Sequence, residues 1–261
     1  MLVKTRDGNQ LYAQSFGDTG TQTIIFCNSL GTDYRMWQPQ IEALAADYHV
    51  IVYDTRGHGQ SSAEGEAWTL ADLGQDVIDV LDAFEVEKAT FCGISMGGLT
   101  GQWLAIHQAE RFHHIIVCNT AAKIGTAEAW HQRAQAVRAD GMGPIAESAA
   151  SRWFTPAFCE QHAEKVEPLI NTIRATSAEG YAKCCEVLAG ADLRESLHTA
   201  QVNLTSVGGE SDPVTTIEDA RWIAEQVSGA DLVSVPASHI SNIEAESQFN
   251  AVLYRIMNAY K

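Results

Sequence analysis

Short apolar runs alternate with stretches of helical periodicity along most of the chain. The apolar runs predict strands at residues 23–27, 49–53, 89–92, 115–118, 203–207 and 231–235. Most of the segments between them repeat apolar residues at helical spacing. Because strands that alternate with helices build a parallel sheet, we predict an α/β fold.

Two further patterns refine this prediction near the N-terminus. The segments 2–5 and 10–16 flank Asp7-Gly8 and predict an antiparallel hairpin attached to the edge of the sheet. Thr69 and Asp72 have the spacing of a capping box, and apolar residues then recur on one helical face. We therefore expect a helix that begins there and leads into the strand at 89–92.

The alternation stops after residue 118, and about eighty residues pass before the next strand. This stretch is rich in alanine and predicts helices that are interrupted at Gly141-Met142-Gly143-Pro144, at Thr155-Pro156 and at Pro168. We interpret residues 123–194 as a helical cap inserted into an α/β core of residues 1–122 and 195–261.

The net charge of the chain limits the kinds of molecule that it can bind. The chain of 261 residues carries 33 acidic and 17 basic side chains, a formal net charge of −16, and 46% of its residues are hydrophobic. The apolar fraction argues against a disordered chain, and the acidity argues against binding of nucleic acid or anionic membranes. The cap is nearly neutral at −1, so the remainder carries −15.

No apolar run approaches the roughly 18 residues of a membrane span, and the first residues are polar, so we expect a cytoplasmic protein. The sequence contains no Cys-x-x-Cys spacing and no histidine pair on one helix face, so we do not predict a metal site. We expect buried, reduced thiols at Cys27, Cys92, Cys118, Cys159, Cys184 and Cys185.

Gly93-Ile94-Ser95-Met96-Gly97 follows a predicted strand and opens a predicted helix. This is the context of a nucleophile elbow, a sharp turn that exposes a serine hydroxyl. Glycines on both sides let the strained turn close, and the helix directs its positive dipole end toward developing negative charge. We predict Ser95 as the nucleophile rather than an ordinary serine in a glycine-rich turn.

A serine nucleophile needs a base that is oriented by a third group, in the chain order serine, acid, histidine. Asp212 follows the strand at 203–207, and His239 follows the strand at 231–235. Both fall at the carboxyl edge of the predicted sheet, where α/β folds place their sites. We therefore predict Ser95, Asp212 and His239 as a catalytic triad.

Four other residues compete for these roles less well. Glu210 lies two residues closer to its strand than Asp212, Asp219 belongs to the following helix, and Asn119 carries no charge. His58 is another loop histidine, but its segment is typical of a turn held by glycines and side-chain hydrogen bonds. Nothing in the sequence places His58 near Ser95.

Acyl transfer also requires donors for the oxyanion of the tetrahedral intermediate. One is the backbone N–H of Met96, the residue after the nucleophile. We assign the other to Leu30, in the turn after the strand at 23–27, with Ser29 as the alternative.

With these residues in place, the sequence resembles the α/β-hydrolase superfamily and, within it, the 3-oxoadipate enol-lactonases of bacterial aromatic catabolism. The segments that carry the resemblance are Asn28-Ser29-Leu30-Gly31-Thr32-Asp33, Asp54-Thr55-Arg56-Gly57-His58-Gly59, Gly93-Ile94-Ser95-Met96-Gly97-Gly98, Cys118-Asn119-Thr120-Ala121-Ala122-Lys123-Ile124-Gly125, Trp153-Phe154-Thr155-Pro156 and His239-Ile240-Ser241-Asn242-Ile243-Glu244. The resemblance implies hydrolysis of 3-oxoadipate enol-lactone in the beta-ketoadipate pathway, with the same triad and oxyanion donors and no cofactor.

The substrate implied by this resemblance is a small anionic lactone. Trp130 and Arg133 lie three residues apart on a predicted cap helix and so share a face, which offers an aromatic wall beside a guanidinium. We expect Arg133, Trp130 and Trp153 to bind the substrate. The alternative is that both tryptophans only pack the cap and that Arg133 is a solvated surface residue.

Two other functions remain open from the sequence. The same three residues would serve another serine esterase or a cofactor-free perhydrolase, since the cap selects the substrate. A ligand receptor with negligible turnover is an alternative of a different class. A haloalkane dehalogenase is disfavoured because its nucleophile would be an aspartate at position 95.

Overall fold

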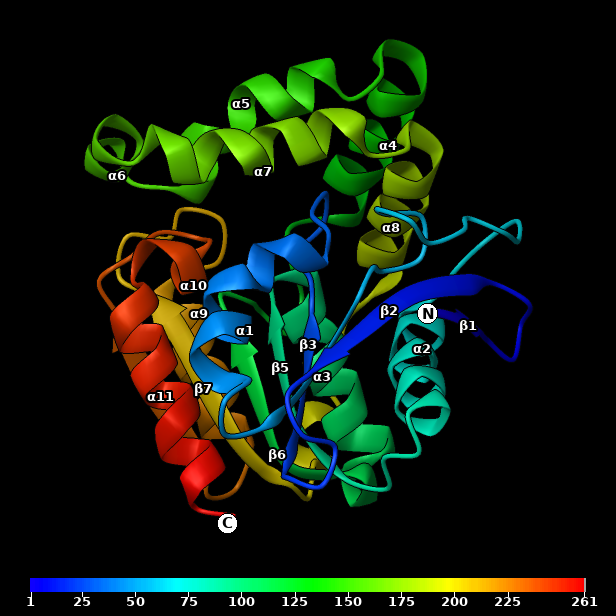
Figure 1. Ribbon diagram of the computed structural model, residues 1–261. Helices are drawn as coiled ribbons and strands as arrows, with labels where there is room; N and C mark the ends of the chain where they lie inside the picture. Colours follow the sequence, from blue (N-terminus) through cyan, green and yellow to red (C-terminus); the bar gives the residue numbers. More distant parts are fainter. Residues whose placement is uncertain (261) are drawn as a thin grey trace.

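Residues 1–260 are described by a computed structural model, in which one mixed eight-stranded sheet runs through the centre of the molecule (Figure 1). Its order is β1-β2-β4-β3-β5-β6-β7-β8; β1 and β2 are antiparallel to their neighbours and all other pairs are parallel. The strands are β1 (Leu2–Lys4), β2 (Gln10–Phe16), β3 (Thr23–Cys27), β4 (His49–Tyr53), β5 (Ala89–Ile94), β6 (Phe112–Cys118), β7 (Asn203–Gly209) and β8 (Asp231–Val235).

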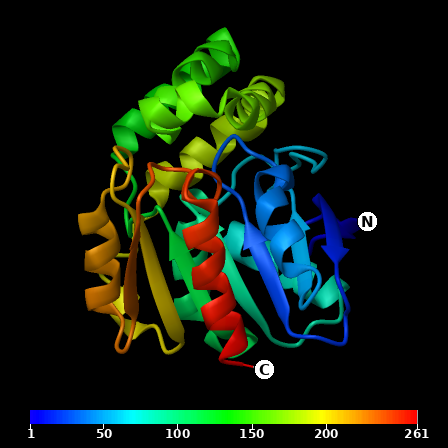
Figure 2. The same ribbon diagram turned by 60° about the vertical axis from the view of Figure 1, so that its left-hand side comes forward.

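Helices surround this sheet, and Figure 2 shows α11 lying across one of its faces. The helices are α1 (Gln38–Leu44), α2 (Leu70–Ala83), α3 (Met96–His107), α4 (Ala127–Asp140), α5 (Gly143–Trp153), α6 (Pro156–Gln161), α7 (Ala163–Ala175), α8 (Ala178–Gly190), α9 (Ile217–Gln226), α10 (Ser241–Glu244) and α11 (Glu246–Asn258). Within residues 1–260, every helix is too short or too polar to cross a membrane.

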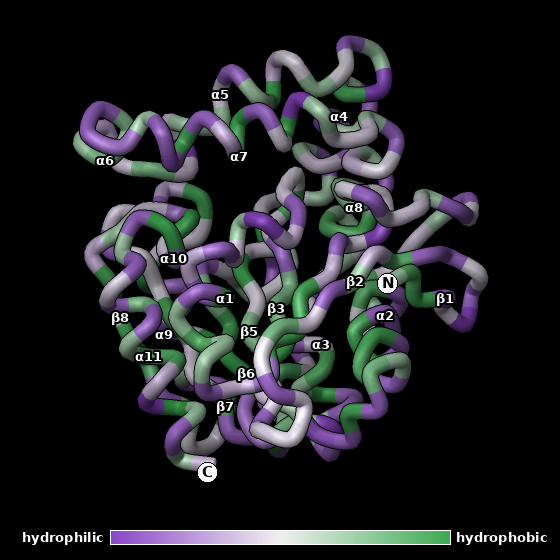
Figure 3. Tube along the Cα trace, in the orientation of Figure 1, coloured by the Kyte–Doolittle hydropathy of each residue, from purple (hydrophilic) through white to green (hydrophobic). Residues whose placement is uncertain are grey.

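The core follows from the composition of the central strands. Every residue of β3, β4 and β5 is buried, because strands inside the sheet are covered on both faces and most of their residues are apolar. In Figure 3 the hydrophobic colour gathers on the central strands and the hydrophilic colour on the outer helices and loops. The predicted α/β architecture is confirmed.

The strands and helix α2 agree closely with the sequence pattern. The predicted runs at 23–27, 49–53 and 231–235 are strands with these bounds, and the N-terminal hairpin lies at the edge of the sheet. The capping box is present, since the Thr69 hydroxyl and the Asp72 carboxylate each accept a hydrogen bond from the other's backbone N–H. The strands predicted at 89–92, 115–118 and 203–207 extend further, to Ile94, back to Phe112 and to Gly209.

Five helices, α4 to α8, lie between β6 and β7 in the chain. Figures 1 and 2 show them as a layer beyond one end of the sheet. This layer packs on the loop after β4, because a Cβ on Gly180 of α8 would lie 2.2 Å from the Gly57 carbonyl oxygen. The division into a cap of residues 123–194 and a core of residues 1–122 and 195–261 stays a prediction.

The expected interruption at Pro168 is wrong. Pro168 lies inside α7, although proline removes one helical hydrogen bond. Val166, Leu169 and Ile173 of this helix are buried, so tertiary packing of one face holds α7 together across the missing bond. The interruptions at 141–144 and 155–156 are confirmed, since α5 begins at Gly143 and α6 at Pro156.

The prediction of six buried thiols is wrong for one cysteine. All six are free thiols, as expected, and five are buried, but Cys159 is partly exposed. It lies on α6, a short helix without buried residues at one end of the layer formed by α4 to α8 (Figure 1).

A buried ion pair joins three separate segments of the core. The Arg56 guanidinium, in the loop after β4, donates two hydrogen bonds to Asp76 of α2, at 2.7 and 2.6 Å. It also donates to Asp7 of the N-terminal hairpin at 2.8 Å. The side chains of Arg56 and Asp76 are each only 2% exposed, so each charge depends on the other for its stabilisation.

We predict that Asp76→Asn lowers the free energy of unfolding by about 3–5 kcal/mol, because it leaves the buried Arg56 charge without its main partner. Urea denaturation of the purified variant measures this loss. The matched control is Asp82→Asn, which removes a half-exposed carboxylate paired with Arg6 and Arg111 and should cost less than about 1 kcal/mol. Equal losses for both variants would contradict the prediction.

Candidate active site

Four neighbouring parallel strands bring polar residues to one edge of the sheet. Ser95 follows β5, Asn119 follows β6, Asp212 lies just beyond β7 and His239 just beyond β8. Because β5, β6, β7 and β8 are adjacent and parallel, their carboxyl ends meet at the same edge. These residues, up to 144 positions apart in sequence, therefore gather in one region.

Ser95 occupies a strained turn between β5 and α3. Its backbone has φ 58° and ψ −114°, a left-handed conformation that a residue with a side chain rarely adopts. The turn closes only because its flanking residues are glycines. A Cβ on Gly93 would lie 2.3 Å from the Gly97 carbonyl oxygen, and a Cβ on Gly97 would lie 2.3 Å from the Cys27 carbonyl oxygen. The strained turn predicted from the sequence is present.

Asp212 is buried and surrounded by donors. His239 Nδ1 lies 2.8 Å from its Oδ2, which also accepts hydrogen bonds from Asn119 Nδ2 and the Thr215 hydroxyl, both at 3.0 Å. Its Oδ1 accepts the backbone N–H groups of Val214 at 2.8 Å and Thr215 at 3.1 Å. The side chains of Asp212 and His239 are 0% and 2% exposed. The carboxylate is therefore fully coordinated by hydrogen bonds.

These donors decide the charge of Asp212. Burial raises its pKa, but the hydrogen bond and charge of His239, followed by the bonds from Asn119 and Val214, outweigh burial and lower the pKa below its ordinary value. Asp212 is thus ionised at neutral pH and holds the His239 ring with the Nδ1 proton directed at it. The Nε2 atom of His239 carries no hydrogen bond within the described chain and is available to another partner.

The competing acids serve other purposes. The Glu210 carboxylate is exposed and accepts a hydrogen bond from Ser234. Asp219 caps α9, because its carboxylate accepts the backbone N–H of Thr216 at 2.7 Å. Neither contacts His239 within residues 1–260, so the geometry favours Asp212 as its partner.

Asn119 connects the parts of this site, a role that was not predicted because a neutral amide cannot serve as the acid of a triad. Its side-chain amide donates to Asp212 Oδ2 and to the Ser238 carbonyl, each at 3.0 Å, and its Oδ1 accepts from the Ser241 hydroxyl at 2.5 Å. Its backbone has φ 46°. Its position at the end of a strand beside the elbow strand was the available signal.

The residues next to Asn119 hold Ser95. The Ser95 N–H donates to the Cys118 carbonyl at 2.9 Å, and the Thr120 hydroxyl donates to the Ser95 carbonyl at 2.8 Å. The Ser95 hydroxyl itself makes no hydrogen bond within residues 1–260. One short segment, residues 118–120, therefore ties the elbow to Asp212 and to the loop that carries His239.

The turn after β3 lies against the start of α3, since a Cβ on Gly97 would also lie 2.9 Å from the Asn28 carbonyl oxygen. Two N–H groups of this turn are already committed: Gly31 donates to His58 Nε2 at 2.9 Å, and Thr32 donates to the Ser29 carbonyl at 3.2 Å. The backbone N–H of Leu30 has no partner within the described residues.

His58 has a more specific place than the sequence indicated. It lies in a turn held by hydrogen bonds, as expected, but it also supports the turn that contains Leu30 by accepting the Gly31 N–H. Its Nδ1 lies 3.2 Å from the Arg56 carbonyl, which fixes the proton on Nδ1. Burial lowers the pKa of His58 to about 4, so the ring is neutral at pH 7.

The three residues predicted to bind the substrate lie on α4 and α5. The Arg133 guanidinium sits 4.9 Å from the centre of the Trp130 ring, so the two side chains share a face as expected. The indole N–H of Trp130 donates to the Ile124 carbonyl at 2.5 Å. Trp153 is buried, and its carbonyl accepts the backbone N–H of Ile240, the residue after His239, at 3.1 Å. Trp153 therefore lies beside the loop of His239.

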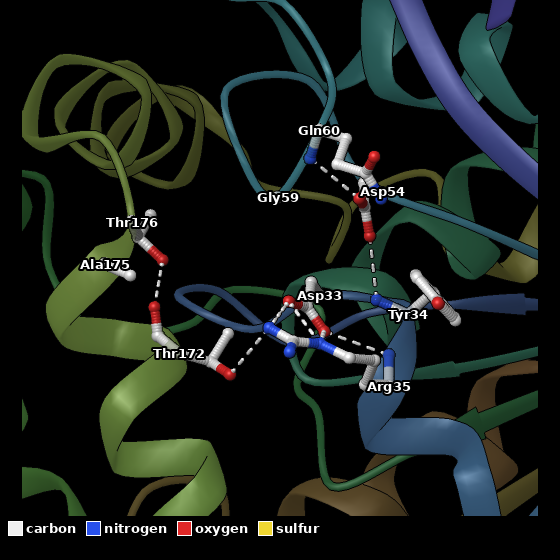
Figure 4. A pocket seen from close by; sticks show the side chains of 9 residues that line it. All are labelled: Asp33, Tyr34, Arg35, Asp54, Gly59, Gln60, Thr172, Ala175 and Thr176. Carbon is white, nitrogen blue, oxygen red and sulfur yellow. Dashed lines mark hydrogen bonds and ion pairs between the residues drawn. The ribbon is translucent and has the colours of Figure 1, made fainter.

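Figure 4 shows a cavity of about 350 Å³ between the loops after β3 and β4 and helix α7. Arg35 binds Asp33 there and reaches Thr172 of α7 at 3.4 Å. Burial raises the pKa of Asp54 to about 6 in its wall. None of Ser95, Asp212 and His239 lines this cavity.

Within residues 1–260, no group of three His, Cys, Asp or Glu side chains is placed to hold a metal ion.

Comparisons with known proteins show the family of the chain. A family profile for the alpha/beta hydrolase fold matches residues 22–246. The chain is 50% identical to 3-oxoadipate enol-lactonase 2 of Acinetobacter baylyi, over 94% of this chain and 92% of that one. It is 45% identical to 3-oxoadipate enol-lactonase 1 of the same organism, over 95% and 93%. The crystal structure of the enol-lactonase from Burkholderia xenovorans LB400 superposes with a TM-score of 0.96 at 36% identity, covering 99% of this chain and 100% of that one.

We predict that His58 makes the protein less stable as the pH falls from 6.5 toward 4. The unfolded chain protonates this ring near pH 6.5, whereas the folded protein keeps it neutral down to about pH 4. The unfolded state therefore binds more protons in this window, and stability falls with pH. His58→Gln should remove about 2 kcal/mol of the loss between pH 7 and pH 5.

Urea denaturation of both proteins at the two pH values measures this difference. Subtracting one pH dependence from the other cancels the contributions of the groups common to both proteins, among them the buried His49 and His114. Parallel pH dependences would show that His58 is not the group that carries this effect.

Proposed function

Because the chain belongs to the alpha/beta hydrolase family and, within it, to the 3-oxoadipate enol-lactonases, we propose that it opens the ring of 3-oxoadipate enol-lactone. The reaction gives 3-oxoadipate through a serine acyl-enzyme. The observation that carries the proposal is the buried Asp212–His239 hydrogen bond of 2.8 Å, which Asn119 and Thr120 connect to the strained turn of Ser95. The partner is a small anionic lactone, and the reaction needs no cofactor.

Acylation begins with proton transfer from the Ser95 hydroxyl to His239 Nε2, while Asp212 stabilises the imidazolium that forms. The Ser95 oxygen attacks the lactone carbonyl, and the tetrahedral intermediate collapses by breaking the ring C–O bond. His239 returns its proton to the departing enol oxygen. The ester that forms on Ser95 still carries its leaving group, because that group is part of the same molecule.

This tether sets the enol-lactone apart from an ordinary ester, whose alcohol diffuses away. The enol oxygen stays beside the acyl carbon and could close the ring again. Tautomerisation of the enol to a ketone removes that nucleophile. Water activated by His239 then attacks the acyl carbon, and Ser95 leaves as the product gains its second carboxylate.

The oxyanion of both tetrahedral intermediates needs two N–H donors, and we propose those of Leu30 and Met96. The commitment of the Gly31 and Thr32 N–H groups to other acceptors supports Leu30 over the later residues of its turn. The close contact between Gly97 and the Cys27–Asn28 backbone supports a shared position for the two donors. Removing one such donor typically costs roughly 10²–10³-fold in rate.

Substrate selection falls to residues 123–194, which we propose as a cap over the core of residues 1–122 and 195–261. The core carries nearly all of the negative charge, which opposes an anionic substrate, whereas the cap is almost neutral. Arg133, stacked on Trp130, is the proposed partner of the substrate carboxylate, and Trp153 the proposed wall beside His239.

We predict that Ser95→Ala lowers kcat for 3-oxoadipate enol-lactone by at least about 10³-fold, because no other hydroxyl can form the acyl-enzyme. Loss of the enol-lactone ultraviolet absorbance measures turnover. Ser211→Ala is the matched control, since this exposed serine adjoins Asp212 and its hydroxyl makes no hydrogen bond within residues 1–260. Turnover by the folded Ser95→Ala variant within tenfold of the parent rate would refute the assignment.

A further inference from the structure

The carboxylate of Glu244, the last residue of α10, joins two segments that are far apart in the chain. Its Oε2 accepts the backbone N–H of Ser238 at 2.8 Å. Its Oε1 accepts the backbone N–H of Thr155 at 3.0 Å and also the Thr155 hydroxyl. Ser238 directly precedes His239, and Thr155 lies in the α5–α6 joint, residues 153–155 (Figure 1). Glu244 therefore bridges the histidine loop and the α5–α6 joint.

The bonding of Glu244 differs from that of an ordinary surface acid. Nearby Glu246 pairs with Lys165 of α7 at 3.0 Å, whereas Glu244 forms no ion pair in the described part of the chain. Its half-buried side chain is instead satisfied by three neutral donors, and these lie at both of its oxygens. A carboxylate accepts hydrogen bonds at both oxygens, whereas the amide of glutamine has one accepting end and one donating end. The bridge therefore requires an acid.

Hydrogen bonds hold the backbone on both sides of His239. The carboxylate described above binds the N–H of Ser238, and the carbonyl of Ser238 accepts the Asn119 amide at 3.0 Å. On the other side, the N–H of Ile240 donates to the Trp153 carbonyl at 3.1 Å. Two of these three bonds lead to the α5–α6 joint. The position of His239 along the sheet edge is thus tied to that joint.

The backbone position of His239 matters because a base must lie within hydrogen-bond reach of the proton it takes. The hydrogen bond to Asp212 orients the imidazole ring through Nδ1, but it does not fix the backbone from which the ring extends. A misplacement of about 1 Å can cost about 10²-fold in rate. A side chain that holds the backbone beside His239 therefore acts on the reaction without touching the substrate.

We propose that Glu244 is a positioning residue, which fixes the backbone of His239 against the α5–α6 joint and so keeps the base in its place. The inference rests on the proposed function, in which His239 is the base. Both oxygens of Glu244 are already bound by Ser238 and Thr155, so Glu244 is not a ligand of the substrate. Its loss therefore lowers the rate of the chemical steps and leaves substrate affinity nearly unchanged.

The first test separates kcat from KM for 3-oxoadipate enol-lactone. Glu244→Ala should lower kcat by roughly 10- to 100-fold and leave KM within about threefold of the parent value. Glu244→Gln should lose less, because it keeps one of the two accepting ends. Glu246→Ala is the matched control, since it removes the ion pair with Lys165 of α7 and should keep the parent kcat. Equal losses in both alanine variants, or a loss confined to KM, would overturn the inference.

The second test changes the other end of the bridge, so it does not depend on the folding of Glu244→Ala. Thr155→Val removes the hydroxyl that donates to Glu244 and should lower kcat less than Glu244→Ala does. Thr155→Ser keeps this hydroxyl and should keep the parent kcat. Because Thr155→Val and Glu244→Ala break the same contact, the double variant should be no slower than Glu244→Ala alone. Losses that multiply in the double variant would contradict the bridge.

Labelling of Ser95 by diethyl p-nitrophenyl phosphate separates this inference from the proposed function, because it needs the His239 base but no lactone. Glu244→Ala should slow the labelling by at least about tenfold, whereas Glu246→Ala should label at the parent rate. This result supports the positioning role even if 3-oxoadipate enol-lactone is not hydrolysed, an outcome that would overturn the proposed function alone. Labelling of Glu244→Ala at the parent rate would overturn the positioning role.

Discussion

The site depends on one buried carboxylate. Asp212 has a fully buried side chain, and an ionised carboxylate in that position is tolerable only if donors replace the water it has lost. Three segments supply those donors: the turn at 213–215, Asn119 beyond β6 and His239 beyond β8. Meeting this requirement holds the ends of three strands together, so the charge that orients the histidine also organises the loops around it.

Backbone sterics impose the complementary constraint on Ser95. The hydroxyl stands at a sharp turn because β5 passes directly into α3, and that passage leaves no room for side chains at Gly93 and Gly97. The contact of Gly97 with the Cys27 and Asn28 backbone brings the start of α3 against the turn that contains Leu30. Residues 118–120 then join this rigid elbow to the polar network around Asp212. Strand order and glycine placement thus position groups that are far apart in the sequence.

The strands and the three main site residues could be predicted from the sequence because they follow from local patterns. Continuous apolar runs predicted the buried strands, and the elbow motif and chain order pointed to Ser95, Asp212 and His239. The roles of Asn119 and His58 depend on partners 93 and 27 residues away, and a neutral amide or a turn histidine carries no local sign of them. The predicted helix interruption at Pro168 was wrong for a similar reason, because burial of one face of α7 outweighs the loss of one backbone donor.

The central claim is that the His239–Asp212 pair activates the hydroxyl of Ser95. Diethyl p-nitrophenyl phosphate tests it directly, because the reagent phosphorylates an activated serine far faster than an ordinary hydroxyl and the modified peptide can be located by mass spectrometry. The account predicts one diethylphosphoryl group per chain, on Ser95, with a labelling rate that falls by at least about 10³-fold in His239→Ala. Labelling of another residue, or labelling of Ser95 at the same rate without His239, would contradict it.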